Sequence, residues 1–139
     1  MIYLANGFSP SMLSKLPLDL EFREISKDEF CEAVKHSINS IGHAGTVELI
    51  NKLCDTAIAV NRISFKADVG DEIYIMVLTV RLEEGRILKS EEIQKMYQEG
   101  KVRLLKARVY NAVLEELIKC TGKCDEATYD TLSYKARSD

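Results

Sequence analysis

The 139-residue chain has few features of membrane-spanning or secreted proteins. Its apolar runs all fall short of the roughly 18 to 20 residues that a transmembrane helix needs. Its first residues, Met1-Ile2-Tyr3-Leu4, lack the basic region, long apolar stretch and cleavage site of a signal peptide. We therefore expect an intracellular, cytoplasmic protein that does not associate with a membrane.

The chain also lacks an excess of positive charge, with 19 Lys and Arg against 22 Asp and Glu. Proteins that bind long nucleic acids usually present a basic face, so this class is disfavoured. The charge is unevenly distributed, because residues 61–108 carry ten basic and eight acidic side chains, whereas residues 1–60 carry five and eight. A phosphate ligand should therefore be small and should contact the middle segment.

Cysteine and histidine are scarce, with four and two residues. Cys31 and Cys54 fall among apolar helical positions and are interpreted as small buried hydrophobic residues. Cys120 and Cys124 could form half of a metal site or a local disulfide, but no second Cys/His pair accompanies them. We therefore predict no metal and no other cofactor. His36 lies off the apolar stripe of its helix and should face solvent.

No internal repeat, low-complexity tract or linker divides the chain, so a single α/β domain with a true core is expected. Apolar patterns predict strands at residues 2–5, 18–25, 62–67, 73–80 and 101–109. They predict helices near residues 12–16, 26–38, 47–54 and 90–99, and a further helix from Tyr110 to about residue 121. Residues 1–108 would then form the α/β domain, and residues 109–139 a C-terminal helix with a polar tail.

One short turn, Gly42-His43-Ala44-Gly45-Thr46, combines features of a catalytic site. Histidine titrates near neutrality, and the glycines on either side let a ligand approach the backbone closely. The helix that follows turns free N–H groups toward the same point, which favours an anion. The turn thus fits a proton donor beside a phosphate pocket. A Gly-rich turn with Thr46 as N-cap and an incidental histidine also explains it, and local sequence alone favours that simpler interpretation.

Two other stretches follow predicted strands. Asn6, Ser9 and Ser11 would lie where the first strand ends and a helix begins, a common ligand position in α/β proteins. Turn and capping chemistry explains them equally well. Arg81 and Glu84 belong to a charge cluster that ends the buried strand at residues 73–80. This cluster either faces a cleft or forms a solvated loop, and the sequence leaves both open.

Five segments occur in the order and at the spacing of a known family; they are residues 3–9, 38–43, 61–62, 81–85 and 97–102. On these segments the chain resembles the viral anti-CRISPR ring nucleases, small proteins of archaeal viruses, phages and some bacteria. The resemblance covers about residues 1–108. It implies a mixed sheet of about five strands flanked by helices, a homodimer, and metal-independent cleavage of cyclic tetra-adenylate. This ring is the second messenger of type III CRISPR defence, so the expected location is the cytoplasm of an infected cell.

Carried over position by position, the resemblance implies that His43 is the general acid and that Arg81 and Glu84 form the active-site pair at a strand end. Asn6 and Ser9 match ligand-contacting positions. In such a reaction the ribose 2′-hydroxyl attacks its own phosphate, and a positioned acid that protonates the leaving oxygen contributes roughly 10² to 10⁴ in rate. We also expect Ser11, Gly42, Gly45 and Thr46 to contact the ligand.

The chain departs from the family pattern at several positions. Ala44 and Gly45 stand where the family has an acidic residue and a serine, Ser11 stands in place of an asparagine, and Val80 in place of a glutamine. Altered contacts of this kind could preserve binding but weaken catalysis. The alternative function is therefore a sponge or sensor that binds the cyclic nucleotide without cutting it. A structural or transcription-related dimer, which would have no affinity for the ring, is a third possibility.

Overall fold

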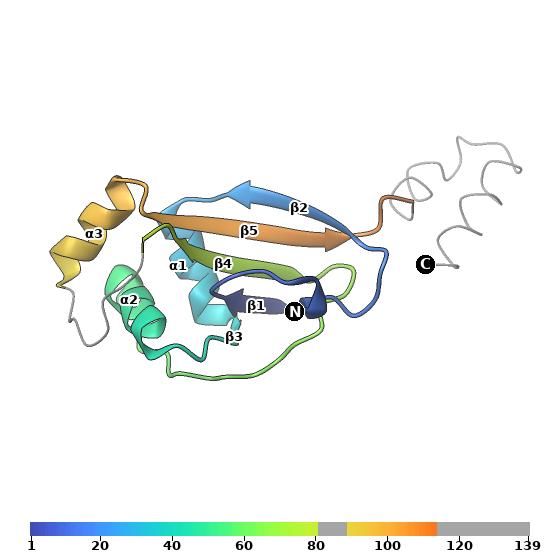
Figure 1. The fold of residues 1–139 in the computed structure, drawn as a ribbon, viewed down its shortest axis with the longest axis horizontal. Helices are drawn as coiled ribbons and strands as arrows, with labels where there is room; N and C mark the ends of the chain where they lie inside the picture. The colour runs from blue at the N-terminus through green and yellow to red at the C-terminus, as the bar shows by residue number, and fades with distance from the viewer. Residues whose placement is uncertain (81–88, 114–139) are drawn as a thin grey trace, which may run out of the picture.

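Five strands form one mixed sheet in the order β2-β5-β4-β1-β3 (Figure 1). The computed structural model describes residues 1–80 and 89–113. Its strands are β1 (Ile2–Ala5), β2 (Asp19–Glu24), β3 (Ile38–Asn39), β4 (Glu72–Leu78) and β5 (Val102–Tyr110). β1 pairs in parallel with β3 and β4, whereas β5 pairs antiparallel with β4 and β2. The predicted α/β fold with a five-stranded mixed sheet is confirmed.

Three α-helices pack against one face of this sheet; they are α1 (Lys27–His36), α2 (Ala44–Cys54) and α3 (Ser90–Gln98). α1 begins where predicted, because Ser26 Oγ accepts a hydrogen bond from the Glu29 backbone N–H at 3.1 Å. Its apolar positions Phe30 and Val34 are buried against the sheet. β4 contributes to the core on both faces, as the sequence predicted for a central strand.

The opposite face of the sheet is partly covered by a short 3₁₀ helix, η1 (Pro10–Met12), and by the segment that returns from α2 to β4. The strand predicted at residues 62–67 is wrong, since only Ala67 makes an isolated bridge, to Leu13. The alternation that suggested a strand has another origin. Phe65 and Ala67 point into the core, with Phe65 stacked on Tyr3 at 4.3 Å between ring centroids, while Lys66 points outward.

Several boundaries also differ from the prediction. The 26–38 helix ends at His36, since Ser37 adopts an extended backbone (φ −94°, ψ 157°), and residues 38–39 form the unpredicted strand β3. His36 is exposed, as expected. Tyr110 belongs to β5 and not to the C-terminal helix, because β2 continues the pairing as far as Asp19 opposite Tyr110. Most of the predicted C-terminal helix and polar tail lies outside the described residues.

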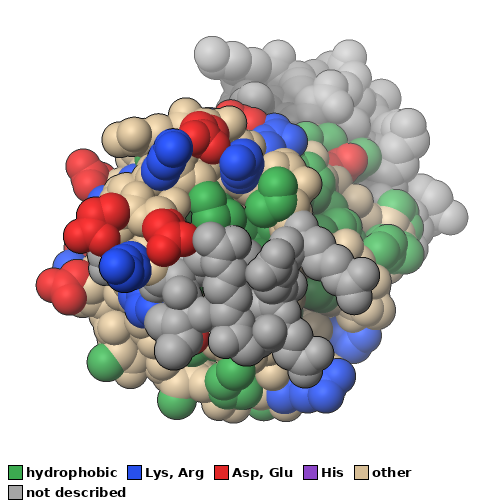
Figure 2. All heavy atoms as spheres, turned by 60° about the vertical axis from the view of Figure 1, so that its left-hand side comes forward, with side chains coloured by type: hydrophobic (Ala, Val, Ile, Leu, Met, Phe, Trp, Pro, Cys, Tyr) green, Lys and Arg blue, Asp and Glu red, His purple; other side chains and the backbone are tan. Residues whose placement is uncertain are grey.

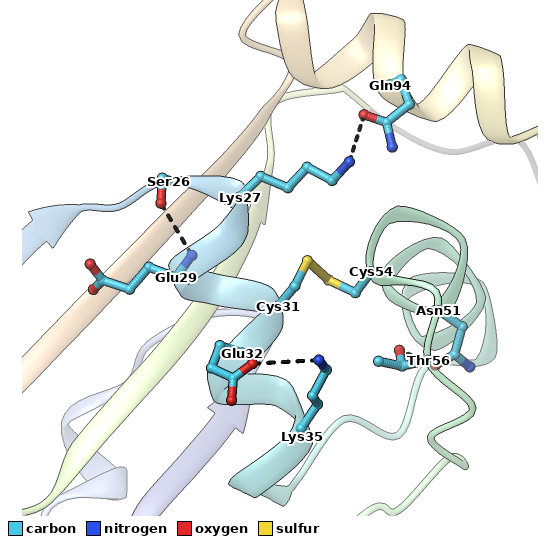
Figure 3. The surroundings of a disulfide bond; sticks show 10 residues. All are labelled: Ser26, Lys27, Glu29, Cys31, Glu32, Lys35, Asn51, Cys54, Thr56 and Gln94. Atoms are coloured by element: carbon cyan, nitrogen blue, oxygen red, sulfur yellow. Dashed lines mark hydrogen bonds and ion pairs between the residues drawn. A yellow bond between two sulfur atoms is a disulfide. The ribbon is translucent and has the colours of Figure 1, made fainter.

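The interpretation of Cys31 and Cys54 as separate buried hydrophobic residues is wrong. They are joined by a disulfide with a Cα–Cα distance of 5.1 Å, and both residues are only half-buried (Figure 3). The pairing was invisible in sequence because the two cysteines are 23 positions apart and lie on different helices. Cys120 and Cys124 lie outside the described residues. Across residues 1–80 and 89–113, no helix is long and apolar enough to span a membrane.

Candidate functional site

The three parallel strands β3, β1 and β4 end at one edge of the sheet, at the left of Figure 1. In open α/β sheets, ligands bind beyond the carboxyl ends of parallel strands. Asn6 follows β1 at this edge and is exposed. The chain beyond β3 is fixed to the same place, because the backbone N–H and the hydroxyl of Ser40 both donate to the Leu4 carbonyl, at 3.0 and 2.7 Å. This edge therefore carries the turn that contains His43.

His43 is the N-cap of α2, and its side chain is exposed. Its Nδ1 accepts a hydrogen bond from the Thr46 backbone N–H at 3.2 Å. The prediction that Thr46 is the N-cap is therefore wrong, because the helix begins three residues earlier and Thr46 occupies its third position. Since Nδ1 acts as an acceptor, a neutral His43 ring must carry its proton on Nε2. Nε2 has no partner among the residues that the structure describes.

Thr46 is buried, with 4% of its surface exposed, and its Oγ1 lies 3.1 Å from His43 Nδ1. Thr46 therefore contacts the histidine directly and is poorly placed to touch a ligand itself. The backbone N–H groups of Ala44 and Gly45 have no hydrogen-bond partner in the described part of the chain. They point from the first turn of α2 and would suit an anion.

Arg62 lies across the backbone of Gly42. A Cβ built on Gly42 would fall 2.7 Å from both Cβ and Cγ of Arg62 and 3.0 Å from its Cδ. Only glycine leaves room for this crossing, which brings the stem of the exposed Arg62 against the turn that carries His43. Sequence analysis assigned no role to Arg62, although Asn61 and Arg62 form one of the five matching segments. A basic residue at a matched but unassigned position was the signal that pointed to it.

Two asparagines hold the His43 turn and the Arg62 segment together. Asn39 donates from Nδ2 to the Ala59 carbonyl at 2.7 Å and accepts from the Ile41 N–H at 2.9 Å. Asn61 reciprocates, donating from Nδ2 to the Asn39 carbonyl at 2.8 Å and from its backbone N–H to the Ile41 carbonyl at 3.0 Å. These hydrogen bonds hold residues 39–41, which precede His43, against residues 59–61, which precede Arg62.

Ser9 and Ser11, which were also expected to contact the ligand, lie at the short helix η1. Ser9 caps η1, its Oγ lying 3.4 Å from the Ser11 backbone N and 3.1 Å from Ser11 Oγ. This is the capping arrangement that the sequence left open for them, and no hydrogen bond among the described residues joins either serine to the His43 turn.

Arg81 and Glu84 lie outside the described residues, so their roles remain predictions. β4 ends at Leu78, three positions before Arg81, at the edge where His43 lies.

Strand residues with shifted pKa values lie at the opposite end of β4. Burial opposes ionisation of Glu72, but hydrogen bonds from Lys106 and Tyr74 outweigh it, so the pKa of Glu72 is lowered. The Lys106 Nζ to Glu72 Oε2 distance is 3.0 Å, and Tyr74 donates to the same oxygen at 2.9 Å. The cluster joins β4 to β5. Among the described residues, no group of three His, Cys, Asp or Glu side chains could hold a metal ion.

Sequence and structure comparisons agree on what this chain is similar to. A family model described as STIV B116-like matches residues 2–102. The chain is 43% identical over 113 residues to the uncharacterized protein ORF116 of Acidianus filamentous virus 1, covering 80% of this chain and 97% of that relative. It is 27% identical over 99 residues to the uncharacterized protein 26 of Sulfolobus islandicus filamentous virus, covering 69% and 84%. The solved structure of B116 of Sulfolobus turreted icosahedral virus matches with a TM-score of 0.73 and 34% identity, covering 77% of this chain and 97% of that one.

Proposed function

The chain belongs to the STIV B116-like family of viral proteins, and from the site at its sheet edge we propose that it is a metal-independent ring nuclease for cyclic tetra-adenylate. The observation that carries the proposal is the exposed His43, whose Nδ1 is held by the first turn of α2, in a turn whose Gly42 lies against the side chain of Arg62. Cutting the ring would remove the signal of type III CRISPR defence in the cytoplasm of the infected host. The substrate is inferred from the resemblance of the five matching segments, and the exposed imidazole of His43 and the nearby side chain of Arg62 support the proposed chemistry.

In the proposed reaction, a ribose 2′-oxygen attacks the adjacent phosphorus and the bond from phosphorus to the 5′-oxygen breaks. His43 Nε2 gives its proton to the departing 5′-oxygen, and the 2′-hydroxyl proton passes to Glu84 or to water. The guanidinium of Arg62, together with that of Arg81, balances the negative charge of the phosphate. Each cut leaves a 2′,3′-cyclic phosphate and a 5′-hydroxyl, so two cuts give two linear di-adenylates.

Thr46 suits both protonation states that this reaction requires. His43 can donate from Nε2 only when Nδ1 also carries a proton, and a protonated Nδ1 cannot accept from the Thr46 backbone N–H. Thr46 Oγ1, at 3.1 Å, can then accept from Nδ1–H. The backbone holds the neutral ring and the hydroxyl holds the charged one. Thr46 thus acts through His43, as a positioning residue.

The proposal includes a homodimer, since a two-fold pair could present two His43 side chains to opposite phosphates of a four-nucleotide ring. The sheet face opposite the helices offers a surface for it. Phe22 is 49% exposed there and meets Phe8 edge-on, with 5.5 Å between ring centroids. Other half-buried apolar side chains on this face are Leu20, Val77 and Leu105. An interface of standard size buries about 800 Å² per partner.

The distribution of charge also fits a small anion better than a long nucleic acid. Figure 2 shows Lys and Arg side chains interspersed with Asp and Glu on the face it draws, with hydrophobic side chains gathered beside them. Long polyanions favour an extended basic stripe. A ring of four phosphates needs only a few cations, for which Arg62 and the expected Arg81 are the candidates.

One observation favours the second candidate, a sponge that binds the ring without cutting it. The Thr46 N–H donates to His43 Nδ1, and a ring that accepts at Nδ1 is not the doubly protonated form that could act as the acid. Incubation of the purified protein with cyclic tetra-adenylate, followed by chromatography and mass spectrometry, separates the two. The nuclease gives linear di-adenylates with cyclic phosphate ends, also in excess EDTA. Recovery of the intact, protein-bound ring would identify a sponge, and absence of binding would contradict both.

A further inference from the structure

The Cys31–Cys54 disulfide lies where the two arms of the candidate site join. One arm is α2, which runs from Cys54 back to His43. The other is the segment after α2, which runs from Asp55 to Arg62. Figure 3 shows the sulfurs bridging α1 to the last turn of α2, where both arms begin. The covalent loop closed by the disulfide contains β3, the His43 turn and the whole of α2.

The second arm is fixed to the first next to the disulfide. Asp55 takes a left-handed conformation (φ 54°) and its N–H bonds to the Asn51 carbonyl, which ends the helix and turns the chain back. The Asn51 side chain then donates to the Ile58 carbonyl and accepts from the Ile58 N–H, both at 2.9 Å, and from Thr56 Oγ1 at 2.9 Å. The start of the returning segment therefore moves with the last turn of α2.

At their far ends the two arms meet again, where Arg62 crosses Gly42 and Asn61 bonds to Ile41. The two arms are therefore in contact at both ends, next to Cys54 at one end and at the candidate site at the other. An α-helix transmits displacement along its axis, because its backbone is a continuous hydrogen-bonded rod. At the Cys54 end, the disulfide provides the covalent connection to α1 and thereby to the sheet.

We propose that Cys31 and Cys54 are positioning residues for the candidate site, and that reduction of their disulfide loosens the His43 turn and the Arg62 segment together. Both cysteines are half-buried, so a dithiol can reach them. The dithiol supplies two electrons and two protons, the S–S bond becomes two thiols, and the reductant becomes its own cyclic disulfide. Reduction also removes the constraint on the 31–54 loop, which then samples more conformations.

The test compares oxidised and dithiothreitol-reduced protein carrying Cys120→Ser and Cys124→Ser, so that only this disulfide responds. Amide hydrogen exchange should rise on reduction at residues 41–46 and 55–62, while β4 and β5 stay protected. Reoxidation should restore the original pattern. No change in either arm, or an equal rise throughout β4 and β5, would overturn the proposal, because the first shows no coupling and the second shows only global destabilisation.

A second readout rests on the proposed function. Reduction should weaken binding of cyclic tetra-adenylate about fivefold or more, the effect of roughly one lost ordered contact, with a smaller change in kcat. A Cys31→Ala/Cys54→Ala variant should match the reduced protein and no longer respond to dithiol; equal affinity in all forms would contradict the positioning role. If the oxidised protein neither binds nor cuts the ring, the proposed function fails, and hydrogen exchange alone decides on the disulfide.

Discussion

Arg62 passes so close to Gly42 that a side chain at Gly42 would meet it at 2.7 Å. The contact is with the Cβ and Cγ atoms of Arg62, the least movable part of its side chain. A substitution at Gly42 must therefore displace the backbone of one segment or the other.

Gly42→Ala is expected to move Arg62 away from the His43 turn. We predict a loss of about 1 to 3 kcal/mol in the free energy of unfolding from overpacking, and clearly weaker binding of cyclic tetra-adenylate by calorimetry. Gly7→Ala is the matched control, since a Cβ there meets nothing within 4 Å and should change neither quantity. Unaltered binding by Gly42→Ala would show that Arg62 does not contact the ring.

His43 has two separable roles, helix capping and proton donation. His43→Asn keeps a good N-cap but removes the acid, whereas His43→Ala removes both. Both variants should cut the ring about 100-fold more slowly, while only the alanine variant should lose about 1 kcal/mol of stability in denaturant unfolding. Wild-type cleavage by the asparagine variant would exclude His43 as the acid.

The backbone N–H and the hydroxyl of Thr46, which both lie against His43 Nδ1, can be tested separately. Thr46→Val keeps the backbone N–H that meets the neutral ring but removes the hydroxyl that would accept from the protonated one. We expect kcat to fall about tenfold, with binding of the ring unchanged and activity restored by Thr46→Ser. A valine variant as fast as wild type would leave Thr46 with a packing role only.

Phe22 tests the proposed dimer. Phe22→Asp places a charge on the exposed apolar sheet face and should convert a dimer to a monomer in analytical ultracentrifugation. Val69→Asp is the control, because Val69 is similarly exposed, at 41%, but lies in the turn before β4. If Phe22→Asp remains dimeric, this face is not the interface.

The lowered pKa of Glu72 leads us to predict that the stability of the fold depends on pH. Its pKa is lowered in the folded protein, so ionised Glu72 stabilises the fold above its ordinary pKa of 4.5, and this contribution disappears as pH falls through the folded value. Glu72→Gln should therefore lower Tm at pH 7 but have little effect in more strongly acidic solution. Glu99→Gln, which removes an exposed ion pair with Lys101, should shift Tm less at either pH.

Local signals in the sequence predicted most of the fold. The Ser26 cap, the apolar stripe of Phe30 and Val34, and the buried run in β4 were recognised because each is encoded within one element. The errors arose where tertiary contacts decide. Phe65 and Ala67 alternate like a strand but pack without pairing, and a two-residue strand such as β3 has no periodicity to detect.

The candidate site shows the same division. Its histidine and glycines stood out from their own neighbours, whereas Arg62 became visible only when the returning segment was placed over Gly42. Helix capping by a histidine side chain also could not be anticipated, because threonine is the commoner capping residue and lies three positions away. The Cys31–Cys54 bond likewise depends on how two helices face each other.

The same bond has a practical consequence for limited proteolysis. A protease that cuts once between residues 32 and 53 would leave two peptides tethered through Cys31 and Cys54. Such nicked molecules would migrate at full length on a non-reducing gel and separate only after thiol treatment. Apparent resistance to digestion must therefore be judged under reducing conditions.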